Sequence, residues 1–297
     1  MIPGSLQLAA RDIKLSHSIF ALPFALLGAF LARDPAEPWT TSAIKLALIV
    51  SCMVAARTWA MLVNRLADAT LDAANPRTAR RAVASGALPR RSALAFALLS
   101  AAAFVALTLV FGFAFANWWP AILSVPVLAW LAFYSFAKRF TALCHLLLGS
   151  ALAISPIAAA LAINPHALAS TPAIFWLAAM VTVWVAGFDI IYALQDVEYD
   201  QSVALFSIPS RLGVPAALWL SRLLHVAAAV FLALAWRADP RFATIFLAAV
   251  ILVAALLIAE HLILARRGRA GLHMAFFTVN GIVSCVVGGL GVIDVLW

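Results

Sequence analysis

Residues 173–200 read AIFWLAAMVTVWVAGFDIIYALQDVEYD, a long apolar run that ends in acidic residues. A helix that crosses a bilayer needs about 20 mostly apolar residues, and this run supplies them before its last acids. It therefore predicts a transmembrane helix. Asp189, Asp196 and Asp200 stand at its end, and charged side chains in such a place are usually functional.

The rest of the chain has the same apolar character. Of its 297 residues, 66% are hydrophobic and 11% are charged, whereas a soluble domain carries about 25% charged residues. This composition excludes a soluble globular enzyme, a disordered chain and a nucleic-acid-binding module. The net charge of +8 is typical of a membrane protein whose cytoplasmic loops contact anionic lipid. The expected partner is therefore the lipid bilayer, with no nucleic acid and no obligate protein partner.

Nine apolar stretches are long enough to cross a membrane, which predicts an all-α integral membrane protein with nine transmembrane helices. Polar or proline-containing breaks separate them. The predicted spans are residues 15–33, 41–64, 92–112, 119–137, 142–163, 173–195, 215–236, 242–265 and 273–296.

Lysine and arginine are distributed unequally between the two sides of these spans. One side collects 15 of them and the other side 4, while Arg57 lies within a span. The positive-inside rule then predicts a cytoplasmic N-terminus and a C-terminus outside. The expected location is the inner or plasma membrane, crossed many times.

The two longest cytoplasmic loops follow the second and the sixth predicted spans. They cover about residues 65–91 and 196–214, and four spans separate them. We therefore expect one membrane-embedded domain, residues 1–297, made of two four-helix units (about 12–140 and 141–265) and a ninth helix (about 273–296).

Each of these loops begins with acidic residues at helical spacing. Asn64, Asp68 and Asp72 are four residues apart, so a helix places them on one face. A second set shares one face in the same way and consists of Asp189, Tyr192, Asp196 and Asp200. Either set alone is compatible with a solvated loop face, but their recurrence at equivalent places favours a functional role.

Paired carboxylates suit a divalent cation. Mg²⁺ takes oxygen ligands, usually one or two carboxylates with phosphate oxygens and water. Two acid sets facing each other across a bundle would hold Mg²⁺ bound to a diphosphate and make that diphosphate a better leaving group. Arg77, Arg80 and Arg81 follow the first set and suit contacts with phosphate oxygens.

These motifs resemble those of the UbiA superfamily of intramembrane aromatic prenyltransferases. The first acid set matches the pattern Asn-x-x-x-Asp-x-x-x-Asp, and the second, from Tyr192 on, matches Tyr-x-x-x-Asp-x-x-x-Asp. Residues 75–86, 134–141 and 207–213 are also similar to stretches of that family. The chain most resembles the branch of 4-hydroxybenzoate polyprenyltransferase, with the related menaquinone prenyltransferase of the futalosine route.

The resemblance implies a helical bundle with a central cavity open toward the cytoplasmic side. It also implies Mg²⁺-dependent transfer of a polyprenyl group from polyprenyl diphosphate to an aromatic acid such as 4-hydroxybenzoate, in ubiquinone or menaquinone biosynthesis. The implied metal ligands are Asn64, Asp68, Asp72, Asp196 and Asp200. The implied catalytic residues are Asp68, Asp72, Asp189, Tyr192, Asp196 and Asp200, of which Asp189 or Tyr192 would take a proton or position the acceptor. The implied substrate-binding residues are Asn64, Arg57, Arg77, Arg80, Arg81, Lys138, Arg139, Lys14 and His17.

Some of these assignments have a simpler alternative. Arg57 lies inside a span, where an arginine is costly unless it is paired, so it would hold an anionic substrate group or form an internal ion pair with a motif acid. Lys14 and His17 would contact substrate, or Lys14 would extend toward lipid headgroups. Three residues depart from the family pattern, namely Arg65, Ala82 and Ala204. The first removes a possible ligand, and the other two concern loop closure.

Two other functions are compatible with parts of this pattern. Prenyl transfer to a lipid, a porphyrin or homogentisate would use the same acids. A proton-coupled membrane transporter would also place carboxylates in a duplicated bundle. Transporter acids tend to lie at the bilayer midplane, however, whereas these acids lie at span ends beside an arginine-rich loop.

Overall fold

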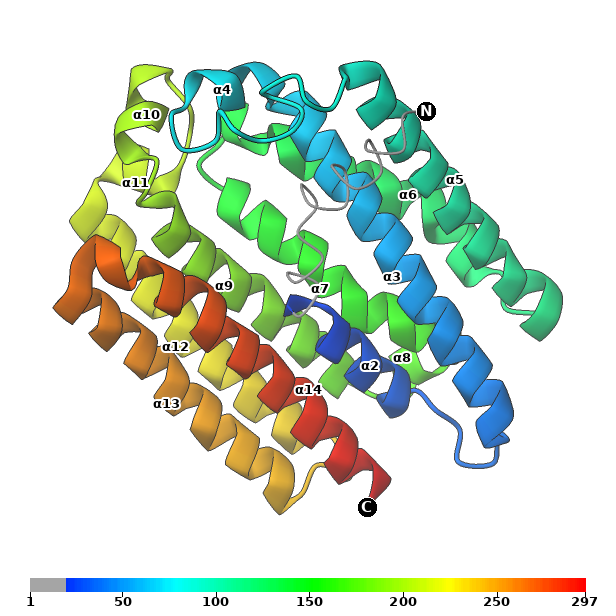
Figure 1. Ribbon diagram of the computed structural model, residues 1–297. Helices are drawn as coiled ribbons and strands as arrows, with labels where there is room; N and C mark the ends of the chain where they lie inside the picture. The colour runs from blue at the N-terminus through cyan, green and yellow to red at the C-terminus, as the bar shows by residue number, and fades with distance from the viewer. Residues whose placement is uncertain (1–19) are drawn as a thin grey trace. The chain divides into compact units, whose positions relative to one another are not determined.

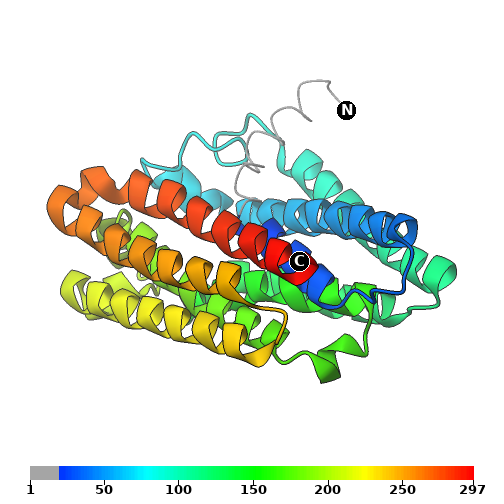
Figure 2. The ribbon, with the colours of Figure 1, turned by 90° about the horizontal axis from the view of Figure 1, so that it is seen from below.

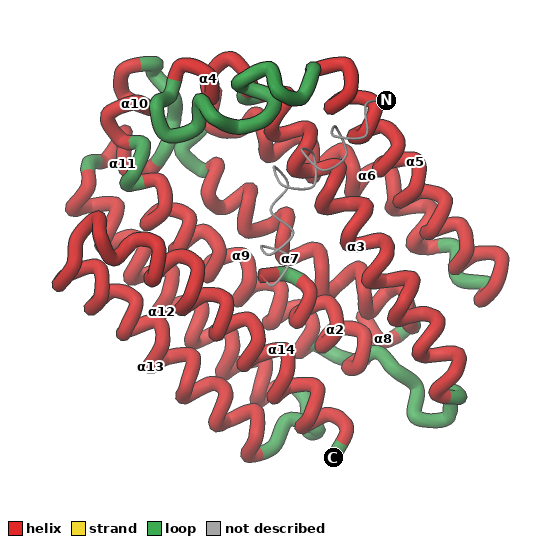
Figure 3. Tube along the Cα trace, viewed as in Figure 1, coloured by secondary structure: helices red, strands yellow, loops and turns green. Residues whose placement is uncertain are grey.

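The protein is described by a computed structural model that covers residues 20–297, apart from the side chain of Arg269. Within this range the chain forms helices joined by short loops and contains no strand, which confirms the predicted all-α class (Figure 3). Lys14 and His17, two of the predicted substrate-binding residues, lie outside the described residues.

Eight helical segments in the described part of the chain are long and apolar enough to cross a membrane. Six are the single helices α3 (Trp39–Ala67), α5 (Arg90–Phe115), α7 (Cys144–Ile163), α9 (Ala173–Ala193), α12 (Val214–Ala238) and α13 (Thr244–Arg267). Two are composite: Trp119–Arg139 joins α6 (Trp119–Phe133) to the 3₁₀ turn η2 (Tyr134–Arg139), and Met274–Leu296 joins the π-helical turn η4 (Met274–Val279) to α14 (Asn280–Leu296).

Helix α2 (Leu22–Leu31) corresponds to the first predicted span but has only ten described residues. The count of nine spans therefore stays a prediction. Short helices fill the loops between the spans: α4 (Ala69–Ala74), α8 (Ala167–Ser170), α10 (Val197–Ser202), α11 (Ile208–Leu212) and the 3₁₀ turn η3 (Gly268–Gly271).

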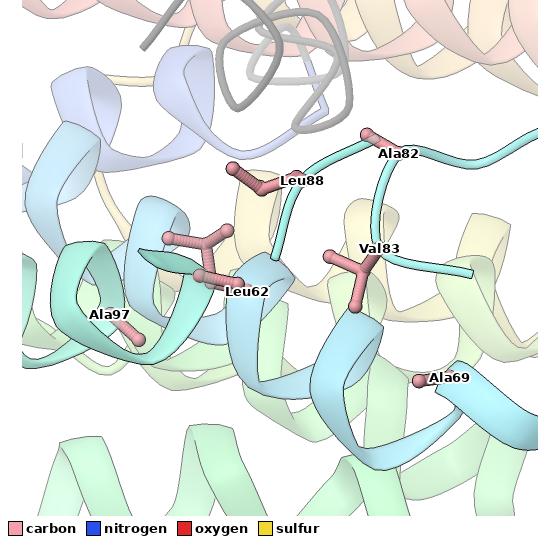
Figure 4. Packing of buried hydrophobic residues seen from close by; sticks show 7 residues of the cluster. Leu62, Ala69, Ala82, Val83, Leu88 and Ala97 are labelled. Atoms are coloured by element: carbon pink, nitrogen blue, oxygen red, sulfur yellow. The ribbon is translucent and has the colours of Figure 1, made fainter. Parts of the chain in front are cut away.

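The described chain divides into two compact units, residues 47–137 and residues 20–46 with 138–297. In the first unit α5 packs against α6, and the indole N–H of Trp59 in α3 donates a hydrogen bond of 2.9 Å to the carbonyl of Leu128 in α6. Apolar side chains hold the loop that follows α4 against α3. Val83 and Leu88 lie in one apolar cluster with Leu62 of α3 (Figure 4).

Six helices of the second unit form a closed ring of contacts. Helix α2 packs against α7, α7 against α9, α9 against α12, α12 against α13 and α13 against α14, which returns to α2 (Figure 1, Figure 2). Association of helices in lipid depends on close packing, because the lipid tails are as apolar as the side chains. The ring is therefore expected to depend on how closely these backbones approach.

Glycine permits that close approach between α14 and α2. A Cβ atom at Gly288 would collide with the backbone and ring of Pro23, whereas a Cβ at the adjacent Gly289 would meet nothing within 4 Å. The Gly288–Gly291 stretch therefore serves helix packing, because a Cβ at Gly291 would likewise meet Leu27 and Phe246.

A buried polar chain also crosses the second unit. The indole N–H of Trp184 in α9 donates to the side-chain oxygen of Asn280 in α14 (2.6 Å), and the amide of Asn280 donates to Glu260 in α13 (3.0 Å). All three residues are fully buried. Buried polar groups are costly without partners, so these hydrogen bonds fix the positions of α9, α13 and α14 relative to one another.

The paired glycines give a direct test of the packing. We expect Gly288→Ala to lower the midpoint of thermal unfolding in detergent, because the new methyl group overpacks the contact with Pro23 at a cost of about 1–3 kcal/mol. Gly289→Ala is the matched control and should leave the midpoint unchanged or raise it slightly, because alanine favours helix. Equal midpoints for the two variants would contradict this account of the α2–α14 contact.

Candidate functional site

The first acid set lies where a long helix ends and a short one begins. Asn64 is in the last turn of α3, Asp68 stands between α3 and α4, and Asp72 is in the first turn of α4. The N–H of Asp68 donates to the carbonyl of Asn64 (2.9 Å), and the N–H of Asp72 donates to that of Asp68 (2.7 Å). The helical hydrogen-bond spacing therefore continues through the break, and the three residues keep one face.

Side-chain contacts divide this set into two parts. The guanidinium of Arg81 donates to both carboxylate oxygens of Asp72, at 2.8 Å each. Both bonds start from the same nitrogen, Nη1, so the contact is a bifurcated, charge-assisted hydrogen bond and not a fork of two nitrogens. The amide of Asn64 donates to Asp68 at 3.4 Å and receives a hydrogen bond of 2.9 Å from Arg65. Two predicted site residues, Asp72 and Arg81, thus bind each other, and Asn64 with Asp68 forms a separate pair.

Apolar packing and a backbone hydrogen bond fix the loop that carries the arginines of the first set. Val83 and Leu88 bury the loop against α3, and the N–H of Leu88 closes it by donating to the carbonyl of Ala82 (2.8 Å) (Figure 4). Arg77 and Arg80 are exposed, in contrast to the buried Asp68 and Asp72. The loop therefore presents two cations beside buried carboxylates, an arrangement that suits a metal-bound phosphate group.

The second acid set resembles the first in part of its backbone, although three residues (194–196) separate α9 from α10, whereas Asp68 alone separates α3 from α4. Asp196 stands between α9 and the six-residue α10, as Asp68 stands between α3 and the six-residue α4. Its φ and ψ are −111° and 6°, against −92° and 6° at Asp68. The N–H of Asp200 donates to the carbonyl of Asp196 at 2.7 Å, the same length as the bond between Asp72 and Asp68. Each unit thus carries an acid in a helix break, followed by a second acid one turn later.

Asp200 lies outside the spans and is buried. Burial raises the pKa of its carboxyl above the ordinary value, whereas a hydrogen bond with Ser207 and the charge of Lys138 act in the opposite direction. The carbonyl of Asp200 accepts a hydrogen bond of 2.8 Å from the N–H of Leu205. The residue just before Leu205, Ala204, has φ 55°, a conformation that glycine adopts more readily, so the alanine adds local strain.

Asp189 has a partner that the sequence analysis did not identify. Its carboxylate lies 2.7 Å from the imidazole Nδ1 of His145 at the start of α7. The two residues are 44 positions apart, so no local pattern points to their contact. Tyr192, one turn further along α9, places its ring 4.3 Å from that of Phe276, between ring centroids.

The remaining predicted residues lie around these sets. Lys138 and Arg139 are half-buried in η2, and the carbonyl of Lys138 accepts a hydrogen bond of 2.7 Å from the N–H of Phe206. This bond ties the turn η2 to the loop after α10. Arg57 is half-buried in α3, about two turns before Asn64.

The donor atoms of both acid sets are carboxylate and amide oxygens, which are the ligands that Mg²⁺ prefers. Within residues 20–297, no group of three or more His, Cys, Asp or Glu side chains is gathered closely enough to hold a metal ion. The residues therefore fit an ion that takes one or two protein ligands and completes its shell with phosphate and water oxygens, which describes Mg²⁺ in phosphate-binding sites.

Comparison with known proteins agrees with this arrangement. The chain is similar to the 4-hydroxybenzoate octaprenyltransferase of Pseudoalteromonas atlantica, with 27% identity over 292 residues, which covers 98% of this chain and 96% of the relative. The apo structure of a UbiA homolog from Aeropyrum pernix K1 is 32% identical and superposes with a TM-score of 0.82, covering 95% of this chain and 98% of that one.

A UbiA homolog from Archaeoglobus fulgidus, solved with GPP and Mg²⁺ bound, shares the fold at 16% identity, with a TM-score of 0.72 and coverage of 98% of this chain and 100% of the other. The sequence profile of the UbiA prenyltransferase family matches residues 21–282. The fold, the paired acid sets and this match lead to one conclusion: the chain is a multi-pass membrane prenyltransferase and belongs to the UbiA prenyltransferase family.

Proposed function

We propose that the protein transfers a polyprenyl group from polyprenyl diphosphate to an aromatic acid, such as 4-hydroxybenzoate, in the biosynthesis of ubiquinone or menaquinone. The observation that carries this proposal is the repeated acid set. Asp68 and Asp196 each stand in a helix break just before a six-residue helix, and each is followed by a second acid one turn later. The name of the Pseudoalteromonas atlantica relative supports the acceptor class.

In this proposal the acid sets bind the diphosphate through Mg²⁺. Asn64, Asp68, Asp196 and Asp200 supply oxygen ligands, while Asp72 keeps Arg81 oriented toward the phosphate oxygens by accepting hydrogen bonds from its Nη1. When bound, Mg²⁺ neutralises charge on the diphosphate and makes it a better leaving group. The exposed Arg77 and Arg80, with Lys138, stabilise the negative charge that grows on the departing group.

The reaction breaks the bond between the allylic carbon and the diphosphate oxygen. The leaving diphosphate keeps the electron pair, and the electron-rich ring attacks the allylic cation to form the new carbon–carbon bond. The ring then loses the proton of the substituted carbon. Asp189, whose side chain is 23% exposed, is placed to accept that proton or to hold the ring, with Tyr192 as the neighbouring alternative.

The acceptor is proposed to carry a carboxylate. An arginine inside a span costs about 2.5–3.5 kcal/mol on the insertion scale, so Arg57 is expected to meet an anion in the working state. Lys14, His17 and Arg139 belong to the same set of proposed substrate contacts. Transfer to a lipid, a porphyrin or homogentisate would leave the donor chemistry unchanged and alter only the acceptor contacts.

Both acid sets should be required for activity. We expect Asp68→Asn or Asp196→Asn each to abolish nearly all product formation, because either change removes a charged ligand from the metal-bound diphosphate, and chelation of Mg²⁺ should do the same. Glu198→Gln is the matched control, since Glu198 is exposed on α10 beside these acids. The measurement is turnover of a labelled prenyl diphosphate by folded protein in detergent. Near-normal turnover by either single variant would exclude the two-set site.

Arg57 gives a test of the acceptor. Arg57→Ala should raise the acceptor KM by up to about 10²-fold with little change in kcat, if it removes about 2–3 kcal/mol of uniform binding. Steady-state kinetics with 4-hydroxybenzoate and with the corresponding neutral phenol measure this effect, and Arg57→Lys is the charge-preserving control. Equal use of the phenol by the unmutated protein, or a change confined to donor or Mg²⁺ use, would contradict an acceptor role.

We propose a cytoplasmic N-terminus and an outward C-terminus, because the 15 basic residues assigned to one side outnumber the 4 on the other. Reporter fusions after Trp297 should therefore be active only when the reporter works outside the cytoplasm. Fusions within residues 75–89 should behave in the opposite way and serve as the internal control. An active cytoplasmic reporter at the C-terminus would mean an even number of spans or the reverse orientation.

A further inference from the structure

His145 joins two parts of the second unit through its two ring nitrogens. Nδ1 lies 2.7 Å from a carboxylate oxygen of Asp189 in α9, and Nε2 accepts a hydrogen bond of 3.2 Å from the backbone N–H of Ile208 at the start of α11. A backbone N–H only donates, so Nε2 must be the nitrogen without a proton. The proton is therefore on Nδ1, which donates it to Asp189.

The residues around His145 hold the loop before α11 in the same place. The carbonyl of Phe206 lies 3.3 Å from the thiol of Cys144, and the N–H of Phe206 donates to the carbonyl of Lys138 (2.7 Å). With the bond from Ile208, two loop residues are tied to the segment that begins α7. Several interactions thus fix the backbone of this loop. The side chain of Asp189 is held by its hydrogen bond with His145 of the same segment.

Exposure separates the roles of the two side chains. The side chain of His145 is 3% exposed and that of Asp189 is 23% exposed. The imidazole has both nitrogens in use and almost no free surface, so it is not placed to touch a substrate. The carboxylate of Asp189 keeps an open edge. Any effect of His145 on the reaction must therefore pass through Asp189 or through the loop.

We propose that His145 is a positioning residue for prenyl transfer, whose Nδ1–H holds the Asp189 carboxylate in the orientation that the acceptor ring requires. The inference rests on the proposed function, because it assigns Asp189 to the acceptor side of the reaction. A carboxylate at the end of a helix can rotate about two side-chain bonds, and a small error in the position of such a group lowers the rate steeply. One hydrogen bond from a rigid, buried ring removes that freedom.

Two amide substitutions separate the two contacts of the imidazole. In His145→Asn the side-chain amide lies near the place of Nδ1 and can still donate to Asp189, but it does not reach Ile208. In His145→Gln the longer side chain places its oxygen near Nε2, where it can accept from Ile208, and the bond to Asp189 is lost. We expect His145→Gln and His145→Ala to lower kcat by about 10²-fold, with the donor KM unchanged. His145→Asn should keep kcat within about tenfold of the unmutated protein.

A second measurement shows whether the effect passes through Asp189. Asp189→Asn should lower kcat on its own, and adding His145→Ala to it should cause little further loss, because the two residues act as one unit. Midpoints of thermal unfolding identify variants that are merely destabilised. The proposal is overturned if His145→Gln retains as much kcat as His145→Asn, if all three His145 variants keep full activity, or if the two losses multiply in the double variant.

These results are distinguishable from failure of the proposed function. Product from the unmutated protein with a labelled prenyl diphosphate and 4-hydroxybenzoate, without the pattern expected for the His145 variants, overturns this inference alone. No product with any aromatic acid overturns the proposed function and this inference together. A stability loss that is equal in His145→Asn and His145→Gln, with equal kcat, would assign the histidine a purely structural role.

Discussion

Carboxylates are costly in a bilayer, and this cost decides where the protein places its chemistry. Both acid sets lie where a long apolar helix stops and a six-residue helix begins. The helix is interrupted by one residue at Asp68 and by three residues, 194–196, before α10, yet the N–H of the acid four residues after Asp68 or Asp196 still bonds to that residue's carbonyl at 2.7 Å. The break carries the acids out of the apolar run, and the retained bond keeps successive acids on one face.

The two loops that accompany these acids are stabilised by different interactions. The first is held by apolar packing, with Val83 and Leu88 buried in one cluster with Leu62 of α3 (Figure 4). The second is held by hydrogen bonds from Phe206 and Ile208 to the segment around the start of α7. Both kinds of interaction fix the backbone of a loop beside an acid set, and with it the groups that the loop presents. Such fixed groups need no reorganisation during a reaction, which is the condition for efficient electrostatic stabilisation.

The ion pair between Arg81 and Asp72 modifies the simplest account of the proposed metal ligands. Both oxygens of the Asp72 carboxylate accept from Nη1 of Arg81 at 2.8 Å, so part of the carboxylate's acceptor capacity is already in use. Asp72 is then better suited to orienting Arg81 than to binding an ion directly, which leaves Asn64 and Asp68 as the ligands proposed for that unit. The same reasoning applies to Asp189, which is oriented by His145.

Much of this protein follows from its sequence because the bilayer imposes a simple rule. Runs of about 20 apolar residues must become helices, so eight of the nine predicted spans agree with helices of the described residues to within a few residues, and the helix face that carries Asn64, Asp68 and Asp72 was predictable as well. Local spacing also indicated the Mg²⁺ chemistry and, with the resemblance, the family. Contacts between residues far apart in the chain were decided by the tertiary structure. Three contacts of this kind join separate helices: the hydrogen bond between His145 and Asp189, the close approach of Gly288 to Pro23, and the buried hydrogen bonds that link Trp184 to Glu260. A helical pattern states which residues share a face but not which helix that face meets, because the choice of neighbour depends on the packing of the whole ring.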